Sequence, residues 1–156
     1  MIKQALGLLA CILLTMAVGG ISGFATIDGV NGWYRTLSKP SFNPPNYLFG
    51  PVWSLLYILM GISLFLVLRA KPTAEKRKAL GIFTAQLVLN FFWSILFFRF
   101  HQIGFAFAEI VLMWVFILWM IIAFRPLSKT ASYLQLPYLA WVSFASVLNG
   151  AILYLN

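Results

Sequence analysis

The chain has 156 residues, of which 62% are hydrophobic and only 9% carry a charge. Soluble domains carry roughly 25% charged residues, so the polar shell that a water-soluble fold needs is missing. The formal net charge of +8 could indicate a nucleic-acid-binding protein. The basic residues, however, cluster in short segments between long apolar runs, where Lys and Arg orient membrane helices. We therefore expect no nucleic-acid partner.

Five long apolar segments predict five membrane-spanning helices. In chain order they cover residues 5–26, 44–68, 79–98, 103–124 and 130–154. At about 1.5 Å of rise per residue, each is about 30 Å long or longer, which matches the hydrocarbon core of a bilayer. We therefore expect an all-α integral membrane protein in which residues 1–156 form a single five-helix bundle, with the lipid bilayer as a partner.

The first segment could instead be a secretory signal peptide, since Lys3 precedes it. Its length argues against cleavage, because the apolar region of a signal peptide is usually about 7–15 residues long. Gly19 and Gly23 are four positions apart, a spacing of small residues that lets two membrane helices approach closely. The pattern leaves open whether the neighbouring helix belongs to the same chain or to a second copy.

Basic residues are unevenly distributed between the two sides of the predicted bundle. Most of the 11 Lys and Arg residues precede the first segment or lie in the second and fourth connections. Cytoplasmic connections carry the excess of Lys and Arg in membrane proteins. In a bacterial plasma membrane, this distribution places the N-terminus in the cytoplasm and the C-terminus outside.

The connection over residues 27–43, on the outer side, is longer than a tight turn and contains Trp33, Tyr34 and Phe42. Long connections with their own aromatic residues are usually lids or binding loops. Trp and Tyr also concentrate among lipid headgroups at the membrane surface. These residues alone favour both interpretations equally.

Few residues could carry enzyme chemistry. The chain has three acidic residues, one histidine and one cysteine, and no spacing matches a metal site or a catalytic triad. We therefore expect no metal and no conventional acid–base catalysis. Glu109 is the one charge inside a predicted helix, where a carboxylate is a functional candidate. The favoured interpretation is a shallow Glu109 that pairs with Arg99 or His101.

Three segments carry aromatic or amide side chains at helical spacing, which places them on shared helix faces. The residues are Trp53 and Tyr57 in the second segment, Gln86, Asn90, Trp93 and Phe97 in the third, and Trp141, Ala145 and Asn149 in the fifth, with Tyr138 beside them. They could be hydrogen bonds and packing between helices, or a pocket for a flat aromatic ligand. Pro51 and Pro137 lie inside predicted helices and indicate bends around such a cavity.

Four separated motifs carry a resemblance to a known family. The outer connection contains WYRTLSKPSFNPP (33–45), the second segment VWSLLY (52–57), the third QLVLNFFW (86–93), and the fifth LPYLAW (136–141) with LN (148–149). In this order they resemble the TspO/MBR family, known in mitochondria as the translocator protein or peripheral-type benzodiazepine receptor. The resemblance covers essentially the whole chain. The cholesterol motif of eukaryotic members needs a Lys or Arg after a Tyr near the C-terminus, and none follows Tyr154. Cholesterol is therefore not an expected ligand, and the short C-terminus resembles that of bacterial members.

The resemblance implies a homodimeric five-helix bundle whose ligand cavity opens toward the first connection and binds porphyrins. The motifs carry over eight cavity residues, to which the stripes add Tyr57 and Tyr138. The eight are Tyr34, Trp53, Asn90, Trp93, Trp141, Phe144, Ala145 and Leu148. No cofactor is required, and porphyrin is the expected ligand. Arg35 and Lys39 are placed to attract its propionates at the cavity mouth.

The resulting hypothesis is a receptor or transporter-like protein that binds tetrapyrroles in the membrane and regulates porphyrin or stress metabolism. One alternative is a light-dependent porphyrin-degrading activity that uses the cavity tryptophans, as some bacterial members of the family are reported to have. Another is a scaffold or regulatory partner without transport, in which Gly19 and Gly23 form a dimer face.

Overall fold

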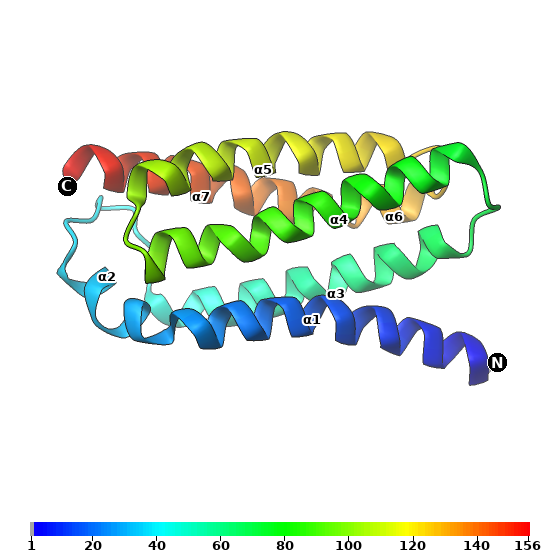
Figure 1. Ribbon diagram of the computed structural model, residues 1–156, viewed down its shortest axis with the longest axis horizontal. Helices are drawn as coiled ribbons and strands as arrows, with labels where there is room; N and C mark the ends of the chain where they lie inside the picture. The colour runs from blue at the N-terminus through cyan, green and yellow to red at the C-terminus, as the bar shows by residue number, and fades with distance from the viewer. Residues whose placement is uncertain (1) are drawn as a thin grey trace.

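A computed structural model describes residues 2–156 and shows five long helices that run side by side (Figure 1). They are α1 (Ile2–Asn31), α3 (Phe49–Leu68), α4 (Ala74–Ser94), α5 (Ile103–Phe124) and α7 (Leu136–Leu155). Shorter elements join or extend them, namely α2 (Trp33–Thr36), the 3-10 helix η1 (Asn46–Leu48), the π-helix η2 (Ile95–Arg99) and α6 (Lys129–Tyr133). Residues 2–156 contain no strand. Five spans are long and apolar enough to cross a bilayer, which confirms the predicted all-α integral membrane bundle.

The helices differ from the predicted segments mainly at their ends. α4 begins at Ala74, before its apolar run, because Thr73 caps it. The Thr73 Oγ1 accepts a hydrogen bond from the Lys76 backbone N–H at 3.2 Å. Pro51 and Pro137 lie in the first turns of α3 and α7, where a missing N–H removes no bond from a helix interior. The prolines therefore remove no hydrogen bond from the interior of α3 or α7, and a bend around the cavity stays a prediction.

α1 and α3 pack closely over their middle portions. A Cβ atom added at Gly61 would lie 2.5 Å from the Ile12 Cα, and one added at Gly19 would lie 2.0 Å from the Tyr57 ring. The Thr15 hydroxyl donates to the Tyr57 carbonyl oxygen at 2.7 Å across the same contact. Small residues permit this approach, which maximises van der Waals contact between helices in lipid. The neighbour of Gly19 is therefore a helix of the same chain.

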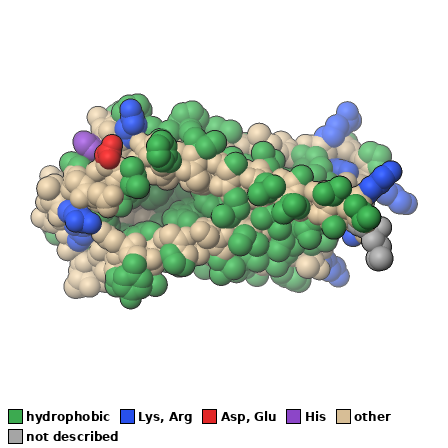
Figure 2. Space-filling view, turned by 90° about the horizontal axis from the view of Figure 1, so that it is seen from below, with side chains coloured by type: hydrophobic (Ala, Val, Ile, Leu, Met, Phe, Trp, Pro, Cys, Tyr) green, Lys and Arg blue, Asp and Glu red, His purple; other side chains and the backbone are tan. Residues whose placement is uncertain are grey.

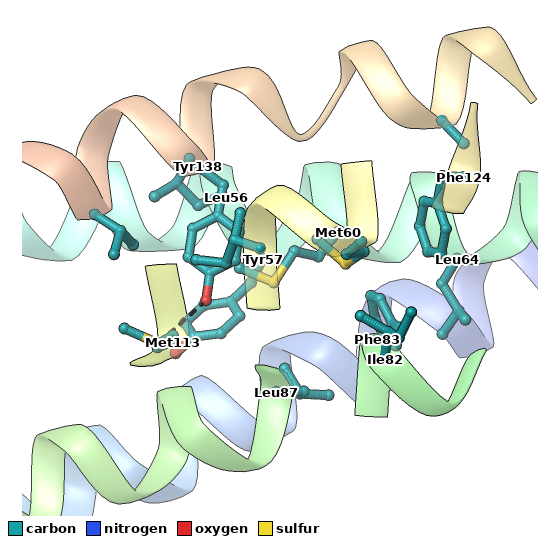
Figure 3. Close-up of a cluster of buried hydrophobic side chains, with 14 of the residues drawn as sticks. Leu56, Tyr57, Met60, Leu64, Ile82, Phe83, Leu87, Met113, Phe124 and Tyr138 are labelled. Atoms are coloured by element: carbon teal, nitrogen blue, oxygen red, sulfur yellow. Dashed lines mark hydrogen bonds between the residues drawn. The ribbon is translucent and has the colours of Figure 1, made fainter. Parts of the chain in front are cut away.

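The bundle has two unlike ends. The loop end carries residues 32–48 and the C-terminus, and the N-terminal end carries the start of α1 and the connection from α3 to α4 (Figure 1). Toward the N-terminal end, large apolar side chains fill the space between helices (Figure 3). Met60, Met120 and Phe124 are fully buried there, and Phe124 stacks on Phe83 with ring centroids 6.1 Å apart. This half is a solid core, which leaves the loop end as the place for a site.

Candidate ligand cavity

A cavity of about 500 Å³ lies in the half of the bundle near the loop end. The C-terminal half of α1, the N-terminal half of α3 and the last turns of α4 form its walls, and Tyr34 of α2 joins them from the connection. Figure 2 shows the surface hollowed in this half of the molecule. Within residues 2–156, the side chains that line it are all uncharged. Its volume lies in the range of small-molecule sites, about 300–1,000 Å³.

Two tryptophans supply the aromatic walls. Trp53 of α3 lies one turn before Tyr57 and stacks on it, with ring centroids 5.7 Å apart. Trp93 of α4 stacks on Phe97 at the same separation, and its Nε1–H donates to the Asn149 Oδ1 at 3.1 Å. Rings held from two sides in this way offer fixed flat faces to a flat ligand.

A chain of hydrogen bonds fixes the polar part of the wall. The Tyr57 hydroxyl donates to the Asn90 Oδ1, and the Asn90 Nδ2 donates to the Tyr138 hydroxyl at 3.0 Å. Tyr138 in turn donates to the Gln86 Oε1 at 3.0 Å. Figure 3 shows the Tyr57 and Tyr138 rings lying close together beside Met113. In a region of low dielectric such bonds are strong and specify one geometry, so the Asn90 amide is held in place beside the cavity.

The connection between α1 and α3 is fastened over the loop end. The Tyr34 hydroxyl donates to the Asn43 Oδ1 at 2.7 Å. Asn156 at the end of α7 makes two bonds with the Ser38 backbone, each 2.9 Å long: its Oδ1 accepts from the N–H and its Nδ2 donates to the carbonyl oxygen. Burial raises the pKa of Tyr34 to about 12, so its hydroxyl remains a donor at neutral pH. These contacts favour the lid interpretation of the connection.

A sequence model of the TspO/MBR family matches residues 11–155. The chain belongs to the TspO/MBR family. Tryptophan-rich protein TspO of Chlorobaculum tepidum is 45% identical over 158 residues, which cover 99% of this chain and 98% of that protein. Translocator protein of Homo sapiens is 38% identical over 122 residues, covering 77% and 72%. Tryptophan-rich sensory protein of Cereibacter sphaeroides is 35% identical over 124 residues, covering 80% and 77%. The resemblance seen in the motifs is thereby confirmed.

In this TspO/MBR protein, the structure brings half of the predicted site residues to the cavity. Five of the ten line it, and these are Tyr34, Trp53, Tyr57, Asn90 and Trp93. The other five, all on α7, do not: these are Tyr138, Trp141, Phe144, Ala145 and Leu148. The reason is that α7 packs along α5, so its stripe faces helices and the connection rather than the cavity.

The α7 residues support the cavity from behind. Tyr138 is fully buried and acts on the cavity through Asn90. Trp141 contacts the lining residue Phe49 edge-on, with ring centroids 5.9 Å apart. Ala145 and Leu148 are buried in the two apolar clusters of the bundle. For α7, the packing interpretation of the stripe therefore describes the structure better than the pocket interpretation.

One wall of the cavity, formed by α1, contains none of the predicted site residues. Gly19, Ser22, Gly23 and Thr26 of this TspO/MBR protein line the cavity. They recur at three- and four-residue spacing, so a shared helix face could be read from the sequence. Small side chains carry no recognisable chemistry, however, and their spacing is equally typical of helix packing. Only the neighbouring helix distinguishes the two roles.

Glu109 does not make the predicted ion pair. The Arg99 Nη1 donates to the Ala25 carbonyl oxygen at 3.2 Å, and His101 stacks on Trp33 with ring centroids 4.2 Å apart. Both carboxyl oxygens of Glu109 are buried and have no hydrogen-bond partner among the described residues. The predicted pairing with Arg99 or His101 is wrong, because both candidate partners are engaged at the loop end.

Proposed function

We propose that this TspO/MBR protein binds a flat, hydrophobic ligand of the tetrapyrrole class, such as a porphyrin, and acts as a receptor or transporter-like protein in porphyrin or stress metabolism. The observation that carries the proposal is one uncharged cavity walled by Trp53 and Trp93 and edged by the Asn90 amide. Aromatic faces suit a flat ring, and a fixed amide sets its orientation. Porphyrin is the ligand, and no further cofactor is required.

The charged ends of a porphyrin belong outside this cavity. Burying a carboxylate without a partner costs several kcal/mol (on the order of 2–7 even for a neutral polar group), and the lining supplies no cation. Arg35 is exposed on α2, and the Lys39 Nζ lies 4.8 Å from the centroid of the Tyr34 ring. Because Tyr34 lines the cavity, a ring held inside would place its propionates near these two cations.

We propose a bacterial plasma membrane location, with the N-terminus in the cytoplasm and a homodimeric state. The orientation is supported by the basic connection from α3 to α4, which contains Arg69, Lys71 and Lys76. Cysteine placed at Lys71 or at Thr36 tests it, since an impermeant thiol reagent added to whole cells should label only the second. Labelling of the first alone would reverse the orientation.

Porphyrin titration in the dark tests the proposed function. Protein in nanodiscs is titrated with protoporphyrin and followed by porphyrin absorbance, which needs no tryptophan signal. The wild type should saturate, and the Trp53→Phe/Trp93→Phe variant should bind about tenfold more weakly, because one pair of stacked rings contributes about 0.5–1.5 kcal/mol. Trp119→Phe is the matched control, since Trp119 is an exposed tryptophan at the far end of α5. Equal affinity of all three proteins would contradict the proposal.

A further inference from the structure

The wall of the cavity is open on one flank of the bundle. Gly20 and Gly23 of α1 and Gly50 of α3 line the cavity and are at the same time exposed. A Cβ atom added at any of the three would meet no other atom within 4 Å. Residues of a closed wall would be covered on the outside, so these three mark a gap, which we call the slot. Figure 2 shows the hollow on the flank of the molecule, away from its two ends.

The slot lies between the C-terminal half of α1 and the start of α3. The two helices touch at Gly61 and again where Tyr57 meets Gly19. Beyond that contact, both helices present glycine to the space between them, at Gly23 and at Gly50. Without side chains on either edge, the separation of the two backbones is left unfilled.

The outer rim of the slot is apolar. Ile27 of α1 lines the cavity one turn after Gly23 and is 51% exposed, and Phe24, one turn after Gly20, is 82% exposed. Gly23 lies about 12 Å inside the end of α1 at Asn31, at 1.5 Å per residue. Large exposed apolar side chains around an opening indicate contact with hydrocarbon rather than with water.

The alternative route, through the loop end, is narrowed by specific contacts, although the exposed Asn31 and Asn46 also line the cavity there. Tyr34 is only 3% exposed and is tied to Asn43. The pair of bonds between Ser38 and Asn156 holds the connection against the end of α7. A porphyrin-sized ligand that arrived from water would meet this fastened connection, whereas a ligand that arrived from the bilayer meets no side chain at the three glycines of the slot.

We propose that the ligand reaches the cavity sideways, from the hydrocarbon through the slot, while the connection over the loop end stays fastened. This inference rests on the proposed function and narrows the ligand class. The ligand is a flat molecule that dissolves in the lipid leaflet with its charged groups along one edge. Such a molecule slides edge-on between two helix backbones, and its charged edge stays at headgroup depth near Arg35 and Lys39.

A reversible plug in the slot tests the route. Cys11 is replaced by Ala so that a single cysteine, from Gly23→Cys, is available for a bulky methanethiosulfonate reagent that dithiothreitol removes. The protein is reconstituted in phosphatidylcholine vesicles, and protoporphyrin is delivered from donor vesicles. With the adduct in place, both association and dissociation should slow at least tenfold, and reduction should restore both rates in the same sample.

Two controls separate the slot from other effects. The same adduct at Leu13→Cys, an exposed position of α1 away from the cavity, should leave both rates unchanged. Asn156→Ala releases the connection from α7 and should not speed association. If the Gly23→Cys adduct leaves association unchanged, or if Asn156→Ala speeds it tenfold, the ligand uses the loop end and the proposal fails.

The direction of the dissociation rate distinguishes a plug from a damaged site. A plug slows dissociation of ligand loaded before labelling, whereas an adduct that merely displaces ligand contacts speeds it, and that result overturns the proposal. Failure of the proposed function gives a different result. In that case the unmodified protein shows no saturable protoporphyrin binding at equilibrium, whatever the state of the slot.

Discussion

The two halves of the bundle are built from the same helices but from different side chains. Toward the N-terminal end, Met60, Met120 and Phe124 are fully buried between the helices. Toward the loop end, α1 presents glycine, serine and threonine, and a space of about 500 Å³ remains. The difference shows how a cavity forms in a membrane bundle: small residues on one helix leave a space beside the aromatic rings of the neighbouring helices. The solid half then keeps the open half from collapsing.

The largest expected effect comes from a bulky side chain at Gly61, where α1 and α3 approach each other closely. In Gly61→Leu, the new Cβ would lie 2.5 Å from the Ile12 Cα and 2.9 Å from the Cys11 carbonyl oxygen. These are backbone atoms of α1 and cannot rotate away, so we expect a loss of about 3 kcal/mol of stability. Thermal unfolding followed by circular dichroism measures it. Gly81→Leu is the control, because a Cβ there meets nothing within 4 Å, and equal midpoints would contradict the prediction.

The next effect concerns the boundary between the halves, where Asn90 joins Tyr57 to Tyr138. Asn90→Leu removes a partner from both buried hydroxyls, and each unpaired group costs about 1–3 kcal/mol. We expect about 2 kcal/mol of destabilisation together with weaker porphyrin binding, measured by thermal unfolding and absorbance titration. Thr84→Ala on the exposed face of α4, where the hydroxyl bonds only within its own helix, should change neither quantity. Unaltered stability of Asn90→Leu would show that the chain of bonds is not structural.

A smaller effect sharpens the assignment of the cavity walls. Trp53→Ala removes a lining ring, so we expect porphyrin binding to weaken about tenfold, or about 1.4 kcal/mol. Trp141→Ala removes a ring that reaches the cavity only through Phe49, and its effect should stay below about threefold. Dark absorbance titrations of the two variants measure this difference. If Trp141→Ala weakened porphyrin binding more than Trp53→Ala, the ligand would bind closer to α7 than the described cavity.

The smallest expected effect is the pH dependence of the lid. Tyr34 has a pKa of about 12 because of burial, whereas a tyrosine in an unfolded or detached connection titrates near 10. The closed lid is therefore favoured fully below pH 10, and this contribution is lost as the pH rises from about 10 to about 12. Cleavage of the connection by a protease active at alkaline pH, measured across that window, should accelerate for the wild type, because an opened connection is cut more readily. Tyr34→Phe, which cannot titrate, should be cleaved severalfold faster at pH 8 and show no such rise.

The fold could be predicted from the sequence because a bilayer imposes one length on every apolar helix. α5 spans Ile103–Phe124, and uncharged runs of this length have few alternatives. The site could be predicted only in part, because helical spacing identifies a face but not the neighbour that the face meets. Trp53 and Trp141 both lie on aromatic stripes, yet only Trp53 lines the cavity.

The residues that sequence reasoning missed are those without side-chain chemistry. Gly23 shares its spacing with Gly19, but Gly19 contacts Tyr57 while Gly23 has open space beside it. The distinction depends on which residues of α3 lie opposite each glycine, which is a property of the packed bundle and not of either residue. Glu109 shows the same dependence on tertiary structure, because its expected partner Arg99 is directed toward Ala25 instead.

The chain from Tyr57 through Asn90 and Tyr138 to Gln86 has a polarity, since each hydroxyl donates to the next amide oxygen. Turning over the two amide groups reverses every bond while the heavy-atom skeleton stays in place, because an amide oxygen and nitrogen have nearly the same shape. In the structure as it stands, the Gln86 Nε2 has no hydrogen-bond partner among the described residues. In the reversed chain it donates to the Tyr138 hydroxyl. The Asn90 Nδ2 then donates to the Tyr57 oxygen, and the Tyr57 hydroxyl hydrogen becomes free. The cavity wall can thus present either an acceptor or a free donor at Tyr57. Whether a bound ligand donates or accepts there would set the orientation of the Asn90 amide on α4.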